Sequence, residues 1–145
     1  MLTSLLRSLP LLCLVLAPLS GCGDGNPATI KISGKVVLPP GTKVADTDSI
    51  MLTFTPMEGD KGGGGGAVNA KDLTFPAFTV APGKYKVSVN FSPYPGEPGS
   101  DKRVAAFEQL NKAYGQMASR ITYEVTAEKE QPIVIDMAKG SAVKQ

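Results

Sequence analysis

The sequence predicts an all-β fold, an antiparallel sandwich with one inserted amphipathic helix. Six segments of the 145-residue chain alternate apolar and polar side chains with period two, which is typical of half-buried strands. The chain contains 16 glycines and 12 prolines, many of them between these segments, as expected for the turns of a sandwich. One later segment repeats its apolar residues every three or four positions, which indicates a helix.

Residues 1–21 have the pattern of a secretory signal peptide. Arg7 is their single charge, and it precedes the uncharged apolar run LPLLCLVLAPLS. This run is too short for a bilayer-spanning helix, which needs roughly 20 apolar residues. The stretch Leu19-Ser20-Gly21-Cys22 stands in place of the usual A-x-A cleavage site and resembles the lipobox of bacterial lipoproteins.

The lipobox resemblance implies a lipoprotein outside the cytoplasm, anchored to the cell membrane or the outer membrane. It implies diacylglycerol transfer to the Cys22 thiol, cleavage before Cys22 and acylation of the new amine. Two or more acyl chains anchor a protein stably, since each buried methylene contributes about 0.8 kcal/mol. Cys13 lies in the segment that would be removed, so the mature chain would have no internal disulfide. The alternative is an ordinary signal peptide with an incidental cysteine.

Residues 22–28 are polar, glycine-rich and without apolar periodicity, which predicts a flexible tether. The sandwich domain is expected to span 29–138. Its first two strands are predicted at 29–38 and 49–56, where alternate apolar side chains share one face. These side chains are Ile30, Ile32, Val36 and Leu38 in the first segment and Ile50, Leu52 and Phe54 in the second.

Two more strands are predicted in the middle of the chain, at 73–80 and 84–91. Phe78 and Val80 share a face in the first segment. The second segment alternates most regularly, with Tyr85, Val87, Val89 and Phe91 on one face.

A loop and a helix, 92–120, are predicted as an insertion between strands of the sandwich. The stretch SPYPGEPGS contains three prolines and predicts a stiff, extended loop. We expect Asp101 to cap the start of the helix. At Gly115 two alternatives stay open: the glycine weakens a helix that continues to Met117, or the helix ends at Tyr114 with Gly115 as a left-handed cap. The apolar face of the helix consists of Val104, Phe107, Leu110, Tyr114 and Met117.

The last two strands are predicted at 121–126 and 132–137. Ile121, Tyr123 and Val125 alternate in the first, and Ile133, Ile135 and Met137 in the second. Residues 139–145 are expected to form a C-terminal tail.

The stretch Phe78-Thr79-Val80-Ala81-Pro82-Gly83-Lys84-Tyr85-Lys86-Val87 is similar to carboxypeptidase regulatory-like domains. A strand of the form SGKV, here Ser33 to Val36, precedes it as in that family. The spacing before Pro82 is one residue tighter, and NAKD (69–72) replaces the family's Asp-Gly turn. The resemblance implies a transthyretin-like/Ig-like sandwich and a non-catalytic accessory role, often in envelope proteins.

Composition excludes several classes of function. The part after residue 21 keeps 14 of the 15 basic and all 13 acidic residues, and this near-neutral balance without a basic block argues against nucleic-acid binding. Histidine is absent, which excludes His-based triads and His-ligated zinc. We therefore expect no catalytic residues, no cofactor and no metal site.

Three motifs are candidate sites of chemistry. The five glycines of Gly62–Gly66 lack the Lys-Ser/Thr of a phosphate-binding loop and predict a mobile surface loop between two strands. Asp46 and Asp48, with Glu58 and Asp60 farther on, can offer oxygen ligands to calcium, but no calcium-loop pattern is present. The two aspartates before the strand predict a solvated turn. A pair of carboxylates acting as general acid and base has no other support in the sequence.

The insertion 92–120 is the segment expected to choose a partner. Tyr94 on the proline-rich loop and Phe107 and Tyr114 on the helix are the candidate partner contacts, although Tyr94 is expected to pack against the helix. The preferred hypothesis is a lipid-anchored structural or protein-interaction module of the envelope, attached through Cys22. The alternative is a small-ligand or polysaccharide-binding lipoprotein with Tyr94 or Tyr114 at the wall of a groove.

Overall fold

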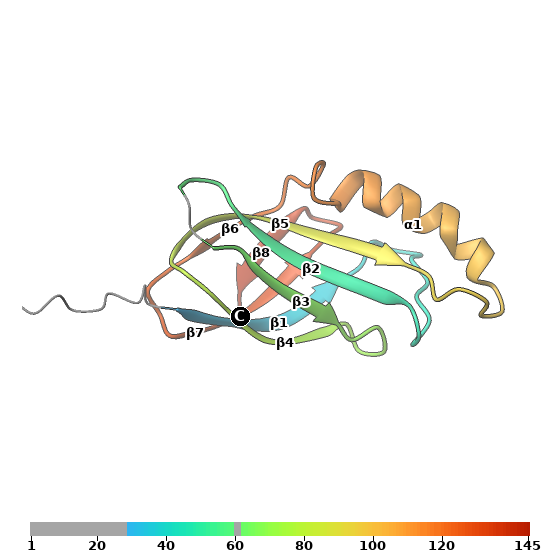
Figure 1. Cartoon of the computed structure of the whole chain (residues 1–145), viewed down its shortest axis with the longest axis horizontal. Helices are drawn as coiled ribbons and strands as arrows, with labels where there is room; N and C mark the ends of the chain where they lie inside the picture. Colours follow the sequence, from blue (N-terminus) through green and yellow to red (C-terminus); the bar gives the residue numbers. More distant parts are fainter. Residues whose placement is uncertain (1–28, 60–61) are drawn as a thin grey trace, which may run out of the picture.

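The computed structural model describes residues 29–59 and 62–145. Two four-stranded sheets face each other, with one helix beside them (Figure 1), which confirms the predicted all-β sandwich with a single helix. The signal peptide, Cys22 and the tether lie outside the described residues. One sheet has the order β4-β1-β7-β8, with strands β4 (Thr74–Val80), β1 (Ile30–Val37), β7 (Glu130–Asp136) and β8 (Ser141–Lys144). The other has the order β3-β2-β5-β6, with strands β3 (Gly64–Val68), β2 (Ser49–Pro56), β5 (Gly83–Ser92) and β6 (Thr122–Val125).

Five of the six strand pairs are antiparallel, as expected, and one is parallel. Strands β1 and β7 run in the same direction, from Lys31 opposite Glu130 to Val37 opposite Asp136. A parallel pair cannot be joined by a tight hairpin, and these two strands are separated by most of the domain. Sequence periodicity shows which face of a strand is buried but not the direction of its neighbour, so this pair could not be predicted.

Strand β3 corrects the expectation that the glycine run is a mobile loop. Residues Gly64–Val68 pair antiparallel with Phe54 to Ile50 of β2. A Cβ at Gly64 would lie 2.5 Å from Val80 Cγ1, and one at Gly65 would lie 2.1 Å from the Leu52 carbonyl oxygen. The close approach of neighbouring groups therefore requires glycine at these two positions, although glycine is a poor strand former by itself.

Strand β8 replaces most of the tail expected at 139–145. Gly140 has a φ of 64°, a left-handed conformation that glycine adopts without steric cost, and the chain reverses there. Ser141 then pairs with Asp136, and Val143 pairs with Val134.

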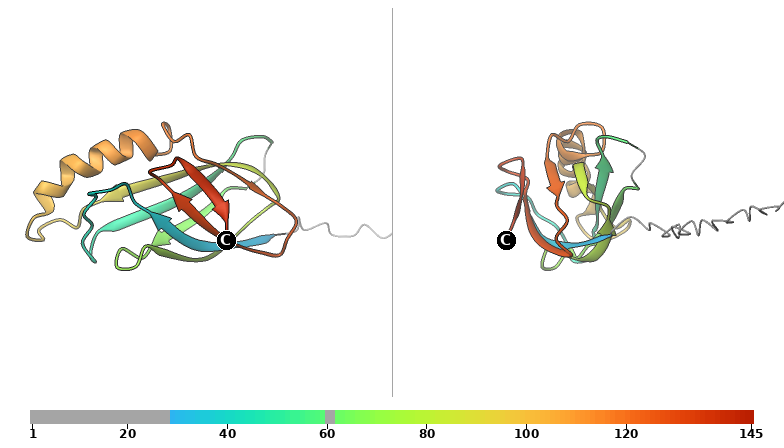
Figure 2. Two further views of the ribbon diagram at one scale, coloured as in Figure 1. Left: turned by 180° about the vertical axis from the view of Figure 1, so that it is seen from behind. Right: turned by 90° about the vertical axis from the view of Figure 1, so that its left-hand side faces the viewer.

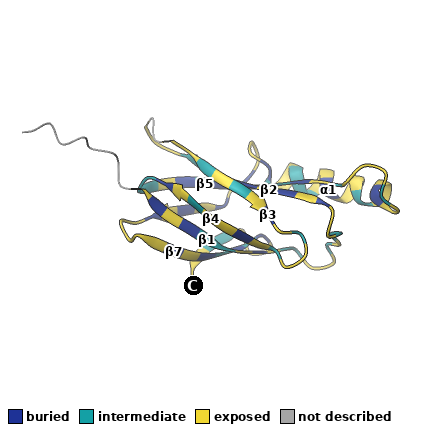
Figure 3. Cartoon of the chain, turned by 60° about the horizontal axis from the view of Figure 1, so that its bottom comes forward, coloured by how far each residue is buried: buried dark blue, intermediate teal, exposed yellow. Residues whose placement is uncertain are grey.

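The core lies between the two sheets. Figure 3 shows buried residues alternating with exposed ones along the strands. The predicted alternation is confirmed in β1, β2, β5, β6 and β7, whose inward residues are buried. In β4 an extra residue places both Phe75 and Phe78 toward the core, because Ile32 lies opposite Phe78 whereas Gly34 lies opposite Phe75. Val80 is buried as expected, and Phe78 is partly buried.

The helix α1 (Ser100–Tyr114) covers the part of β5 that β6 leaves open (Figure 2). Strand β6 pairs only with Gly83 to Lys86 of β5. Farther along β5, Asn111 of the helix accepts a hydrogen bond from the Phe91 N–H (2.8 Å) and donates one to the Phe91 carbonyl (2.9 Å). An open sheet edge is often protected by covering it with a helix, and α1 does so here with a side-chain amide in place of a strand.

The expected apolar face of α1 is only partly correct. Phe107 is buried, and Leu110 and Tyr114 pack partly buried against the core. Val104 and Met117 are exposed, Met117 by 93% because it follows the end of the helix. The hydrophobic face therefore covers the middle and end of the helix rather than its whole length.

The ends of α1 also differ in part from the expectation. The helix ends at Tyr114, which is one of the two alternatives left open by the sequence, but Gly115 is extended, with φ −67° and ψ 172°, rather than left-handed. At the other end Gly99 is the N-cap residue and Asp101 lies in the first turn. The helix starts early because the Ser100 N–H bonds to the Glu97 carbonyl, in a turn that the left-handed Gly99 makes possible. In the part of the chain that the structure describes, no helix is long and apolar enough to cross a bilayer.

Candidate functional site

A groove of about 600 Å³ lies between α1 and the connection from β1 to β2. The helix forms one wall over about three turns, and residues 39–43 form the other. Lys102, Arg103, Ala106, Gln109, Leu110 and Tyr114 line it from the helix, and Pro39, Pro40, Gly41, Thr42 and Lys43 from the connection. The groove therefore combines segments that are about sixty positions apart in the sequence.

The lining of the groove is cationic and apolar. Lys43 and Lys102 are both exposed, and neither takes part in an ion pair among the described residues. No carboxylate belongs to the described lining. Leu110 and Tyr114, which are partly buried against the core, supply apolar surface farther along the helix.

A buried ion pair holds the walls of the groove in place. Arg103 Nε lies 2.9 Å from Asp48 Oδ2, and the side chain of Asp48 is completely buried. Arg103 Nη2 also donates to Asp48 Oδ1 and to Glu97 Oε2, each at 3.1 Å. Thr47 donates its hydroxyl to the same Glu97 carboxylate. The guanidinium is therefore shared between two carboxylates, and Arg103 contributes little free charge to the groove.

Asp48 also binds the backbone of two separate segments. Its Oδ2 accepts the Ala45 N–H at 2.8 Å, and its Oδ1 accepts the Tyr94 N–H at 3.2 Å. A carboxylate that is buried away from water is stable only when its oxygens accept hydrogen bonds and have a cation as a partner. Asp48 thus joins the β1–β2 connection, the proline-rich loop and the helix.

The expectation that Asp46 and Asp48 form a solvated turn is wrong for Asp48. Asp46 is exposed, whereas Asp48 is only 5% exposed. The sequence contained a signal for its burial. Ile50, Leu52 and Phe54 are alternate residues that face the core, and Asp48 is the next alternate position before them. Its partner was not recognisable, since no sequence pattern relates Asp48 to Arg103.

The structure places the three candidate contact residues differently. Phe107 is 1% exposed, with its ring centroid 5.5 Å from that of Phe91, so a partner cannot contact it in this structure. Tyr94 is 58% exposed and does not pack into the helix as expected; its backbone N–H, rather than its ring, makes the contact with Asp48. Tyr114 alone of the three lines the groove.

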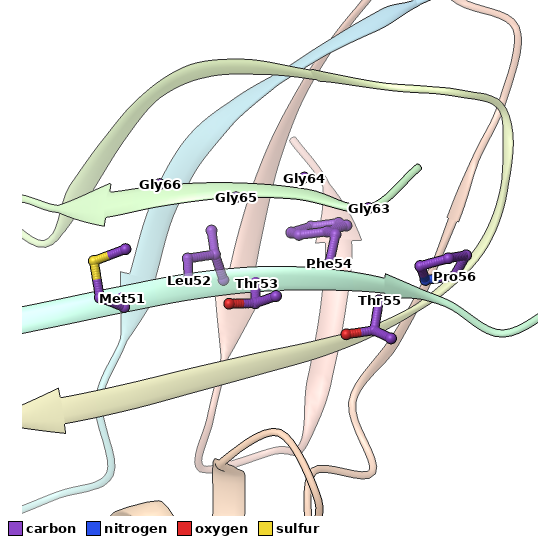
Figure 4. A pocket seen from close by; sticks show the side chains of 10 residues that line it. All are labelled: Met51, Leu52, Thr53, Phe54, Thr55, Pro56, Gly63, Gly64, Gly65 and Gly66. Carbon is purple, nitrogen blue, oxygen red and sulfur yellow. The ribbon is translucent and has the colours of Figure 1, made fainter. Parts of the chain in front are cut away.

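A second hollow, of about 510 Å³, lies along β2 and β3 (Figure 4). Residues 51–56 line it from β2, and the glycines Gly63 to Gly66 line it from the neighbouring segment without any side chain. The described lining holds no charged group. It offers main-chain atoms, apolar surface and the hydroxyl groups of Thr53 and Thr55, but its described lining holds no ionisable side chain.

The described residues contain no group of three or more histidine, cysteine, aspartate or glutamate side chains able to hold a metal ion.

Asp48 is the single buried carboxylate of this part of the chain. A carboxylate enzyme needs two facing acids, one with a raised pKa. Where the pKa of a carboxyl group departs clearly from its ordinary value, it is lowered: by the Thr74 hydroxyl at Asp72 and by the Lys139 N–H at Asp136.

Comparison with known protein families found no match, and comparisons with characterised proteins and with solved structures found none either.

Proposed function

We propose that this chain is a lipid-anchored envelope protein whose sandwich serves as a non-catalytic protein-interaction module. The lipobox-like stretch that ends at Cys22 supports the anchor. The observation that carries the interaction role is the groove beside α1, because it combines charged side chains and apolar surface with a wall that the buried Arg103–Asp48 ion pair holds in place.

The order of the strands differs from that of an Ig-like sandwich. In an Ig-like domain the first two strands are neighbours in one sheet. Here β1 lies between β4 and β7, and β2 belongs to the other sheet. The carboxypeptidase regulatory-like resemblance, which rests on the stretch Phe78 to Val87 and on Ser33 to Val36, remains part of the proposal.

A second candidate is binding of a small ligand or a polysaccharide. Its support is the position of Tyr114, an aromatic ring on the wall of the groove, as this hypothesis requires. Tyr94 lies outside the lining, which leaves a single aromatic residue for stacking on a sugar. We therefore prefer a protein partner.

The anchor is tested by fractionation of cells that produce variants of the full chain. Cys22→Ser should release the protein from membranes or leave the leader attached, because acylation of its thiol precedes cleavage in the proposed processing. Cys13→Ser is the matched control, since it removes the other cysteine of the chain and should leave membrane association unchanged. Equal membrane association of both variants contradicts the anchor.

The interaction role is tested by photo-crosslinking in living cells. Ala105 and Ala106 are adjacent, exposed helix residues, of which only Ala106 lines the groove. A benzophenone amino acid at position 106 should give a discrete adduct with another protein, and the same group at position 105 should give a weaker one or none. Absence of any protein adduct at position 106 contradicts the interaction role.

A further inference from the structure

We infer that the groove beside α1 binds an extended, acidic segment of a partner protein. This inference rests on the proposed interaction role and names the chemistry of what binds. Three features of the groove support it: the charges of its lining, its length and its distance from the proposed anchor.

The free charges of the groove are positive. Lys43 and Lys102 approach it from opposite walls, and neither has an ion-pair partner among the described residues. Arg103, the third cation of the lining, is already shared between Asp48 and Glu97. Because complementary charge steers and selects a partner, the two lysines favour a ligand with carboxylates.

The length of the groove fits a short extended peptide. Lys102 and Tyr114 are twelve positions apart on the helix, which corresponds to about 18 Å at 1.5 Å per residue. An extended chain covers this distance with five or six residues at roughly 3.3 Å each. Since Leu110 and Tyr114 supply the apolar surface, we expect acidic residues beside the lysines and apolar residues toward Tyr114.

The position of the groove favours a partner protein over the bilayer. The described chain begins beside Ile30, and β1 runs eight residues to Val37, a distance of roughly 25 Å in an extended strand. The groove begins beyond this point, at Pro39. Figure 1 accordingly shows the start of β1 and the helix toward opposite ends of the long axis. The groove therefore lies toward the end of the domain opposite to the point at which the proposed anchor would join it.

Fluorescence anisotropy with the full-length lipidated protein in nonionic detergent tests this inference. The probe is a fluorescein-labelled peptide of three glutamates followed by glycine, leucine and phenylalanine, and its matched control has three glutamines. We expect saturable binding of the glutamate peptide and at least tenfold weaker binding of the glutamine peptide. No binding of the glutamate peptide at millimolar protein, or equal binding of both peptides, overturns the inference.

Two charge-reversed variants locate the binding site. Lys43→Glu/Lys102→Glu should weaken binding of the glutamate peptide at least tenfold. Lys35→Glu/Lys112→Glu makes the same change in net charge with exposed lysines outside the groove, and should change affinity less than twofold. If the groove variant fails to fold, Lys43→Gln/Lys102→Gln replaces it, with an expected loss of at least fivefold. Equal effects of groove and control variants overturn the inference.

Other anions distinguish the kind of ligand. Polygalacturonate and phosphatidylglycerol vesicles should compete poorly with the glutamate peptide, and stronger binding of either to the groove overturns the assignment to a protein segment. The crosslinking at position 106 separates the two proposals. An adduct at position 106 without binding of the glutamate peptide refutes the proposed acidic ligand but not the interaction role. Absence of both the adduct and peptide binding refutes the interaction role as well.

Discussion

Removal of the Asp48 carboxylate is the most informative perturbation of the groove wall. The side chain of Arg103 is 16% exposed, and its Nε lies 2.9 Å from Asp48 Oδ2. In the Asp48→Ala variant, the Arg103 guanidinium loses this nearest counter-ion. The Ala45 and Tyr94 N–H groups lose their acceptor as well. Breaking a buried ion pair on one side costs about 3–5 kcal/mol, so we expect the free energy of unfolding to fall by this amount. That is a large share of the roughly 5–15 kcal/mol of an ordinary domain.

Urea denaturation followed by circular dichroism measures this loss. Asp46→Ala is the matched control, because Asp46 is an exposed aspartate two positions away, and it should change stability by no more than about 0.5 kcal/mol. In the double variant Asp48→Ala/Arg103→Ala, the loss should be smaller than the sum of the two single losses, since the residues contact each other. A loss below about 1 kcal/mol for Asp48→Ala would refute the role of the buried pair.

Three further variants test the fold and its pH dependence. Gly65→Ala should cost about 1–3 kcal/mol because its Cβ would meet a β2 carbonyl oxygen at 2.1 Å, whereas Gly66→Ala, with open space around it, should be neutral or stabilising in the same urea titration. Asn111→Ala should cost about 1–3 kcal/mol and speed amide exchange at the β5 edge; unchanged exchange would contradict the capping role. Hydrogen bonds from Thr74 hold the pKa of Asp72 below 3.8, so the stability they contribute is present above pH 4 and is lost as the pH falls below it. The difference in urea midpoint between the wild type and Asp72→Asn should therefore be larger at pH 6 than at pH 2.5.

The sequence predicted much of the core because alternation is a local property. In β5, the inward positions from Tyr85 to Phe91 are all buried as the period of two indicates. The helix was also recognisable from its spacing, and Gly115 indicated Tyr114 as one of two alternatives for its end. Each of these features depends on neighbours in the sequence and on nothing farther away.

The features that the sequence did not show depend on contacts between distant segments. Gly65 pairs with Thr53 of β2, and the close approach of the Leu52 backbone leaves no room for a side chain at this position. Neither contact can be deduced from a run of glycines. Asp48 continues the inward period of β2, but its burial is tolerable only because Arg103 reaches it from the helix. The groove could not be predicted for the same reason, since its two walls meet only in the folded domain.

The intact mass of the native protein, purified from membranes, tests the central claim of a membrane-anchored binding module most directly. The account predicts a chain that begins at Cys22 and carries a diacylglyceryl group on the cysteine sulfur. A mass that includes residues 1–21, or a Cys22 sulfur without lipid, would contradict it.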